Sequence, residues 1–299
     1  MSYFLIIVCA LAFTCNGFAT RLFQTRFKDQ KKNLPLFQSL YCLISTLCFW
    51  GAGGFALPTL TTALYGISFG VLFCLATAMG ARAMETGSMA ISSVIMNMGL
   101  IIPILYSVFM LDEKLTLLHI IGFILFVTSV IFSSLGGKEN KKASLLWLVT
   151  VIVGLLANGL TATIQKVYIM KTPTSQDSVF LGVAYATASL CFAVKYMLSK
   201  SRASRKLESG SNEKGADGRY IIKFIGVSLL ASIGSFIGNL LLGKLTVNVI
   251  AAILYPCVNG GLAVFTTLVS FIIFKEKPTA NKLLSILFGC AAIIILNLG

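Results

Sequence analysis

The strongest constraint on this chain is a stretch of sequence that occurs twice. Residues 97–136 and residues 259–299 each run through an apolar segment, a charged Glu-Lys-x-Thr turn and a second apolar segment that ends in Leu-Gly. A shift of 163 residues maps Glu113 in the first turn onto Glu276 in the second. The chain is therefore predicted to consist of two homologous halves.

Apolar runs dominate the composition. Of the 299 residues, 57% are hydrophobic and only 11% are charged, whereas soluble domains carry about 25% charged residues. Runs long enough to cross a bilayer, about 18 residues or more, recur along the whole length. These features predict an all-α integral membrane protein.

Ten membrane-spanning helices can be placed on the apolar runs. Each is long enough to cross about 30 Å of hydrocarbon at about 1.5 Å per residue. Residues 199–218 are expected to form the longest polar loop. The expected spans are residues 3–23, 34–57, 60–81, 88–111, 116–135, 144–170, 178–198, 220–242, 249–274 and 279–298.

The spans divide into two halves of five, residues 1–137 and residues 144–299, joined by a linker at residues 138–143. Because five is odd, the second half must enter the membrane from the opposite side, which gives an inverted repeat as in many secondary transporters. Further landmarks recur in the same order in both halves: Asn16-Gly17 with Asn158-Gly159, Gly66-Ile67-Ser68 with Gly226-Val227-Ser228, and Asn97 with Asn259.

Two five-helix halves with a Glu-Lys-x-Thr turn after the fourth and ninth spans resemble the drug/metabolite transporter superfamily, EamA type. The resemblance covers nearly the whole chain. It implies that spans one to four and six to nine surround a central cavity, with spans five and ten packed beside it.

The eighth expected span carries a continuous polar face. Ser228, Ser232, Ser235 and Asn239 follow one another at helical spacing. A cavity that is polar on this side and apolar on the matching side of span three would suit an amphipathic solute. The alternative is that the serines allow close packing between helices. The matching positions of span three are Ser68, Leu72, Leu75 and Met79.

Other polar side chains inside the expected spans are also candidates for binding a substrate. A polar group in the membrane needs a partner, and a hydrogen bond to a neighbouring helix, worth about 1 kcal/mol, is the alternative role. Pro103 and Pro256 each remove a backbone donor and can break their helices, which would expose backbone polar groups to a substrate; a structural kink is the alternative. The predicted substrate-binding residues are Asn16, Asn97, Asn158, Gln165, Ser232, Ser235, Asn239, Tyr255 and Asn259.

The charged residues near span ends have a simpler interpretation. Glu113 and Glu276 are interpreted as groups at the membrane surface, with gating as the alternative, and Thr116 and Thr279 as caps of the helices that follow. Lys166 is expected to extend its ammonium group from a span end to the interface.

Several kinds of chemistry have no basis in the sequence. No Asp or Glu lies in the middle of an expected span, the eight cysteines form no Cys-x-x-Cys pair, and His119 is the only histidine. There is also no glycine-rich phosphate loop. We therefore expect no enzyme activity, no metal, no cofactor and no ATP-driven pumping. Proton-coupled export of lipophilic cations is also disfavoured, since it usually needs a carboxylate within a span.

The expected function is secondary transport, by alternating access, of a small neutral or zwitterionic metabolite such as an amino acid. One alternative is a multidrug exporter of amphipathic compounds, and another is a non-transporting membrane scaffold or sensor. The expected partners are the small-molecule substrate and the lipid bilayer, without nucleic acid, and a homodimer is left open.

The basic residues predict the orientation of the chain in the cell membrane. The net charge is +14, and 20 of the 24 basic residues lie in or beside the loops after the odd-numbered spans. The positive-inside rule places those loops in the cytoplasm. Both termini are then non-cytoplasmic, although proteins that resemble this family usually keep both termini in the cytoplasm.

Overall fold

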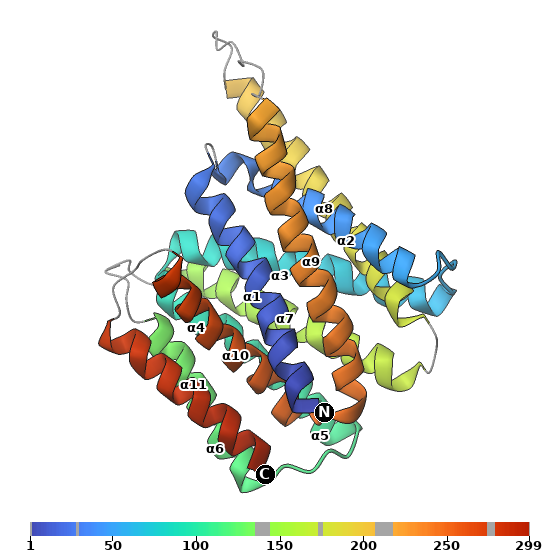
Figure 1. Cartoon of the computed structure of the whole chain (residues 1–299). Coiled ribbons are helices and arrows are strands. Elements are labelled where there is room, and N and C mark those ends of the chain that lie inside the picture. Colours follow the sequence, from blue (N-terminus) through green and yellow to red (C-terminus); the bar gives the residue numbers. More distant parts are fainter. Residues whose placement is uncertain are drawn as a thin grey trace. The chain divides into compact units, whose positions relative to one another are not determined.

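The computed structural model of the chain is built from helices (Figure 1). It describes residues 2–27, 30–134, 144–172, 176–206, 218–273 and 279–298, and within these ranges it contains no strand. The expected linker at residues 138–143 and the turn that holds Glu276 lie outside the described residues.

The helices follow the apolar runs of the sequence. Those of the first half are α1 (Ser2–Arg26), α2 (Gln30–Ala52), α3 (Leu60–Thr86), α4 (Met89–Asn97), the 3₁₀ turn η1 (Met98–Leu100), α5 (Ile101–Met110) and α6 (Leu117–Ser134). Those of the second half are α7 (Leu145–Lys171), α8 (Asp177–Lys206), α9 (Gly218–Asn248), α10 (Ala251–Ile272) and α11 (Ala280–Leu298).

Eight segments of the described chain are long and apolar enough to cross a membrane, and α6 and α11 contain shorter apolar segments. One of the eight combines most of α4 with η1 and α5. The chain is therefore an α-helical, multi-pass membrane protein, as its composition predicts.

Helix α8 is longer than the sequence analysis predicts. It continues to Lys206 and so takes up part of the expected polar loop at residues 199–218. Residues 199–206 contain lysine, arginine and alanine but no glycine or proline. Such residues propagate a helix that has already formed, even beyond its apolar part.

The helices form two compact units, and each unit takes segments from both predicted halves. Unit 1 comprises residues 1–14, 72–174 and 238–299, and unit 2 comprises residues 15–71 and 175–237. Helices α1, α3 and α9 each contribute to both units.

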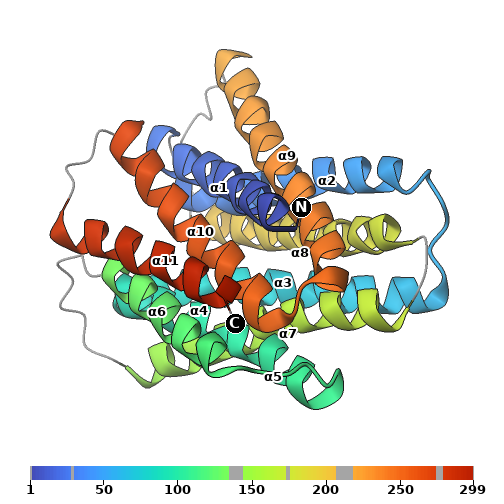
Figure 2. The same ribbon diagram turned by 60° about the horizontal axis from the view of Figure 1, so that its bottom comes forward.

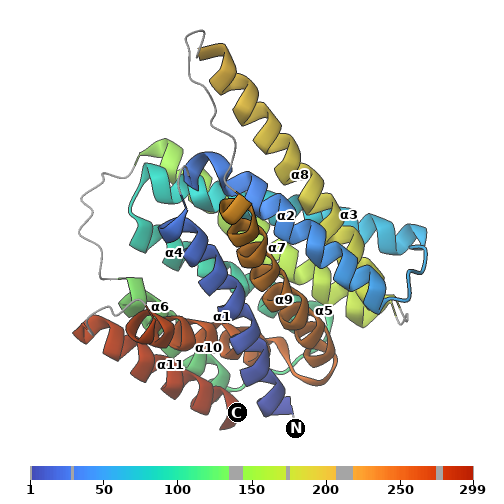
Figure 3. The same ribbon diagram turned by 45° about the horizontal axis from the view of Figure 1, so that its top comes forward.

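In unit 2, α2 and α8 lie side by side (Figures 1 and 3) and run antiparallel. Ser39 of α2 contacts Ser189 of α8, whereas Gly53, just after α2, contacts Val179 at the start of α8. The contact thus moves backward along α8 as it moves forward along α2. The serines exchange two hydrogen bonds. Ser39 Oγ donates to Ser189 O at 3.0 Å, and Ser189 Oγ donates to Ser39 O at 2.9 Å.

In unit 1, α6 and α11 also lie side by side and run antiparallel (Figure 1). Gly122 near the start of α6 lies against Leu296 near the end of α11. Ser129, later in α6, donates its hydroxyl to the carbonyl of Ser285, early in α11, at 2.7 Å. Figure 2 shows α10 beside α11. The core that these helices share with η1 and α5 comprises Leu100, Ile104, Phe126, Val130, Ala251, Ala252, Tyr255 and Ala292.

The fourth expected span is interrupted, although not at the proline itself. The 3₁₀ turn at residues 98–100 separates α4 from α5, and Pro103 lies just beyond it. Proline has no N–H to donate to the carbonyl four residues earlier, which is that of Gly99. Helix α7 approaches this carbonyl closely. A Cβ atom added to Gly159 of α7 would lie 2.4 Å from Gly99 O.

Of the two outcomes that the sequence leaves open for Pro256, the break in the ninth span is not found. Helix α10 is continuous from Ala251 to Ile272, with Pro256 inside it. Because Pro256 is the sixth residue of the helix, the carbonyl that loses its donor is that of Ala252, in the first turn. A single missing bond near a helix end leaves the rest of the helix intact.

Candidate functional site

The turn between α5 and α6 places a carboxylate group at the end of α5. Asp112 has a φ of 53°, in the left-handed region that Asp tolerates better than most residues. This conformation reverses the chain, so that the N–H of Glu113 donates back to the carbonyl of Ser107 at 3.2 Å. The Glu113 side chain therefore starts from a fixed point beside the last turn of α5.

Glu113 forms an ion pair with Lys166 of α7. The Lys166 side chain is 0% exposed and that of Glu113 is 12% exposed. The expectation that Lys166 extends to the interface is therefore wrong. Helix α7 continues for five residues beyond it, to Lys171. A buried ammonium group is retained because an opposite charge lies beside it.

The same carboxylate caps the start of α10. Glu113 Oε2 accepts a hydrogen bond from the backbone N–H of Ala251 at 2.7 Å. Ala251 is the first residue of α10, and Ile250 before it offers no side-chain cap. A carboxylate at this position satisfies a free donor and interacts favourably with the positive end of the helix dipole. Glu113 thus joins the end of α5, the buried face of α7 and the start of α10.

Tyr255 strengthens the contact between α7 and α10. It lies one turn after Ala251 and is 3% exposed. Its hydroxyl donates to the carbonyl of Ala162 at 3.3 Å, and Ala162 lies one turn before Lys166 on α7. The two helices are therefore held together at successive turns, once by Tyr255 and once through Glu113.

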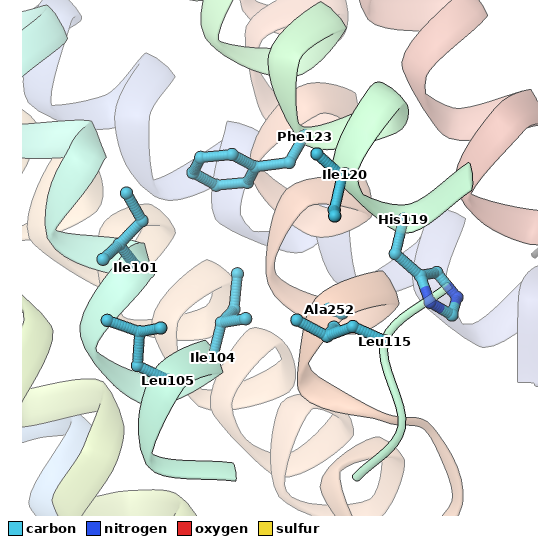
Figure 4. Close-up of a pocket in the computed structure, with 8 residues that line it drawn as sticks. All are labelled: Ile101, Ile104, Leu105, Leu115, His119, Ile120, Phe123 and Ala252. Carbon is cyan, nitrogen blue, oxygen red and sulfur yellow. The ribbon is translucent and has the colours of Figure 1, made fainter. Parts of the chain in front are cut away.

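An apolar cavity of about 110 Å³ lies next to this cluster, between α5, α6 and the start of α10. Figure 4 shows isoleucine and leucine side chains of α5 on one side, and Ile120 and Phe123 of α6 on the other. Its walls suit hydrocarbon rather than a polar solute. The lining residues are Ile101, Ile104, Leu105, Leu115, His119, Ile120, Phe123 and Ala252.

His119 and Thr116 cap the start of α6 together. The N–H of His119 donates to Thr116 Oγ1 at 3.3 Å, and the N–H of Thr116 donates to His119 Nδ1 at 3.0 Å. The cap role predicted for Thr116 is confirmed. Because Nδ1 accepts a hydrogen bond, the neutral ring carries its proton on Nε2. In the described part of the chain, Nε2 has no hydrogen-bond partner.

In unit 2, three of the predicted substrate-binding residues make hydrogen bonds between helices. Asn16 Nδ2 donates to the carbonyl of Ala231 at 2.9 Å. Ser232 shares a hydrogen bond of 2.9 Å with the hydroxyl of Ser45, and Ser235 shares one of 2.6 Å with that of Tyr185. The sequence analysis did not include Ser45 or Tyr185, since neither belongs to a repeated landmark or a polar helical face.

In unit 1, the equivalent residues Asn97 and Asn259 behave alike. Asn97 Nδ2 donates to Ser93 O at 2.8 Å, and Asn259 Nδ2 donates to Tyr255 O at 2.9 Å. In each case the acceptor is the carbonyl four residues earlier in the same helix. Both asparagine side chains are half-buried.

The other predicted residues of unit 1 lie on α7 and α9. Asn158 Nδ2 donates to the carbonyl of Met96 at 3.2 Å, which joins α7 to α4. Gln165 and Asn239 are both buried. Gln165 Nε2 has no hydrogen-bond partner among the described residues. Binding of a substrate by these nine residues stays a prediction.

The cluster of Glu113 and Lys166 was missed because both residues lie near span ends and are 53 positions apart in the sequence. One signal could have indicated it. Lys166 is the only charged residue in the expected sixth span, and a charge in the membrane requires a partner. Among the described residues, no group of three His, Cys, Asp or Glu side chains lies close enough to hold a metal ion.

Comparison with known proteins informs the fold and not the function. No family model matches the sequence, and no curated protein matches it. Among solved structures, 28 chains match. One of these, described only as the crystal structure of a protein, is similar with a TM-score of 0.71 and 13% sequence identity, over 99% of this chain and 96% of that chain. At this identity the likeness shows the fold alone, and it extends over nearly the whole chain.

Proposed function

We propose that this protein is a secondary transporter of the cell membrane that moves a small neutral or zwitterionic metabolite, similar to an amino acid, by alternating access. It has ten spans in two inverted five-helix repeats, as in the EamA-type drug/metabolite transporters that its sequence resembles, and it is not an enzyme. The observation that carries this proposal is the antiparallel packing of equivalent helices.

Helices that the proposed repeat makes equivalent meet twice. Helices α2 and α8 are the second spans of the two halves, and α6 and α11 are the fifth spans. A two-fold axis in the membrane plane reverses the direction of each helix, so equivalent helices that meet at the axis must run antiparallel. Both pairs do so. The reciprocal bonds of Ser39 and Ser189 have the same two-fold relation.

Further packing within unit 1 supports the same symmetry. The fourth span approaches the sixth through Gly99, whose carbonyl faces Gly159. The ninth span approaches the first through Gly261, where an added Cβ atom would lie 2.9 Å from Ala10 Cβ. Gly99 and Gly261 are equivalent in the repeat. Each half thus packs a small residue of its fourth helix against the first helix of the other half.

The count of ten spans rests on α6 and α11, which have 18 and 19 residues. At about 1.5 Å per residue they extend over about 27 Å, close to the hydrocarbon thickness of about 30 Å. With ten spans both termini lie on one side of the membrane, and the basic loops place that side outside the cytoplasm.

The polar residues favour a small substrate without net charge. The amide and hydroxyl groups supply donors and acceptors, and no carboxylate lies at mid-span to bind a cation. We propose Asn239, Asn259 and Tyr255 as the central residues of the site, together with Asn16, Asn97, Asn158, Gln165, Ser232 and Ser235.

Thermal-shift screening of the purified protein against a metabolite panel tests this proposal, because a ligand of the native state raises its melting temperature. Compounds that do so are then tested for counterflow in proteoliposomes. We expect an amino acid or a related zwitterion to be transported. Transport of amphipathic drugs alone would identify a multidrug exporter, and absence of counterflow for every compound would favour a scaffold or sensor.

A further inference from the structure

We propose that Glu113, Lys166 and the start of α10 form a one-sided latch that holds one end of the transport pathway closed. This inference rests on the proposed function, because a latch needs a pathway to close. The three parts come from both halves: Glu113 from the first, and Lys166 and Ala251 from the second. Closing or opening the latch therefore changes how the two halves contact each other.

All three parts lie at the same membrane surface. Because successive spans cross the membrane in alternating directions, the fourth and sixth spans end at the surface where the ninth span begins. The charge distribution makes this surface the non-cytoplasmic one. A latch at this surface keeps the pathway closed to the outside and favours a state that is open to the cytoplasm.

The geometry of Glu113 suits a contact that breaks and forms again. The residue lies on the non-helical turn between α5 and α6, so its carboxylate can leave Lys166 and Ala251 without unwinding a helix. While the latch is closed, burial strengthens the ion pair, because the surroundings screen charges less than water does. Once water enters, both charges are hydrated separately, so the open state is also accessible.

The sequence of the repeat does not supply the same charged pair at the opposite surface. The shift that maps Asn158 onto Asn16 maps Lys166 onto Gln24, which carries no charge. The helix equivalent to α10 is α4, and there Ser88 accepts a hydrogen bond from the N–H of Ile91 as a side-chain cap. The lysine of the latch therefore has no charged equivalent in the repeat, and α4 has a side-chain cap on its own N-cap residue, which α10 lacks.

The consequence is an unequal equilibrium between the two end states of alternating access. A contact that exists in only one state shifts the population toward that state by the free energy of the contact. Removing the latch should loosen the end where α10 begins. It should also tighten the opposite end, where α4 begins, because alternating access closes one end as the other opens.

The test is hydrogen–deuterium exchange of the full chain in nanodiscs, comparing the wild type with the double variant Glu113→Gln/Lys166→Met. The double variant removes the ion pair without leaving a buried charge unpaired. We expect exchange to rise roughly tenfold in peptides covering residues 111–117 and 249–256. We expect exchange to fall in the peptide covering residues 86–92.

The matched control is Glu276→Gln, the same change at the equivalent residue of the second turn. It should not raise exchange at residues 249–256. Glu113→Asp, which keeps the charge but shortens the side chain, should give a smaller change in the same direction as the double variant, and it serves as the second test if the double variant does not fold.

Three results would overturn the latch: unchanged exchange at residues 249–256, a rise there without a fall at residues 86–92, or an equal effect of Glu276→Gln. A rise without a fall would identify a purely structural contact. The exchange experiment needs no substrate, so its outcome is separate from the counterflow assay. A chain that shows the exchange pattern but transports nothing would refute the proposed function and not the latch contact.

Discussion

The hydroxyl groups of Ser39 and Ser189 each donate to the backbone carbonyl of the other residue, at 3.0 and 2.9 Å. Each serine is thus donor and acceptor toward its partner, which is the arrangement that a local two-fold axis produces. The same relation is what the proposed inverted repeat predicts for its two second spans.

We expect Ser39→Ala and Ser189→Ala to destabilise the protein equally, by about 1 kcal/mol each. Each substitution removes one of two equivalent hydrogen bonds and leaves the other. The measurement is the midpoint of unfolding in a denaturing detergent. Ser68→Ala, whose hydroxyl bonds only within its own helix, is the control and should have a smaller effect. A strong inequality between Ser39 and Ser189 would contradict the local symmetry.

Substitutions of the two partners of the buried ion pair should lower the stability of the protein by different amounts. Glu113→Gln leaves the fully buried Lys166 without its counter-charge, and we expect a loss of about 3–5 kcal/mol in the free energy of unfolding. Lys166→Met leaves a carboxylate that still caps α10 and is partly exposed, so the loss should be smaller. The double variant should be more stable than Glu113→Gln alone. Thermal unfolding measures all three.

Lys114→Gln is the control for these variants, because Lys114 follows Glu113 directly but is exposed. It should change stability by less than about 0.5 kcal/mol. If Lys114→Gln destabilised the protein as much as Glu113→Gln does, the loss of stability would come from disturbing the turn and not from losing the ion pair.

The repeated glycines give a matched pair of substitutions. A Cβ atom on Gly159 would lie 2.4 Å from the carbonyl oxygen of Gly99, whereas Gly17, its equivalent in the first half, has no atom within 4 Å of the added Cβ. Gly159→Ala should therefore destabilise the protein by about 1–3 kcal/mol. Gly17→Ala should be neutral or slightly stabilising, because alanine favours the helix. Equal effects of both would show that η1 and α7 do not pack this closely.

The sequence predicts the helices well because apolar runs and charged turns determine where the chain can cross a membrane. The prediction fails where the outcome depends on neighbours. The two prolines look alike in the sequence, yet the helix with Pro103 is interrupted and the helix with Pro256 is not. Lys166 could reach water or a buried acid, and only packing brings Glu113 to it.

The candidate site is less predictable than the fold for a related reason. Helical periodicity shows which polar residues share a face, but not whether their hydrogen bonds are already used within the protein. Asn97 and Asn259 bond within their own helices, whereas Asn16 and Asn158 bond to neighbouring ones. A substrate would have to use the remaining capacity of these amides, or replace the bonds that the structure contains.

Asn239→Leu should lower transport without loss of folded protein. Asn239 is buried on the polar face of α9, and leucine of similar size removes its donors and acceptors. Counterflow in proteoliposomes should fall at least about tenfold while the melting temperature without ligand changes little. Asn248→Leu, an exposed asparagine on the same helix, is the control. Unchanged counterflow of an identified substrate would remove Asn239 from the site.

The orientation of the chain can be tested with a reporter fused after Gly299. The loops after the odd-numbered spans hold most of the basic residues, so the positive-inside rule predicts a non-cytoplasmic end. A fluorophore that matures only in the cytoplasm should stay dark there, and alkaline phosphatase, active only outside, should be active. As a control, the same reporters inserted within residues 207–217, between α8 and α9, should give the reverse result. Cytoplasmic fluorescence after Gly299 would invert the topology and place the Glu113 latch at the inner surface.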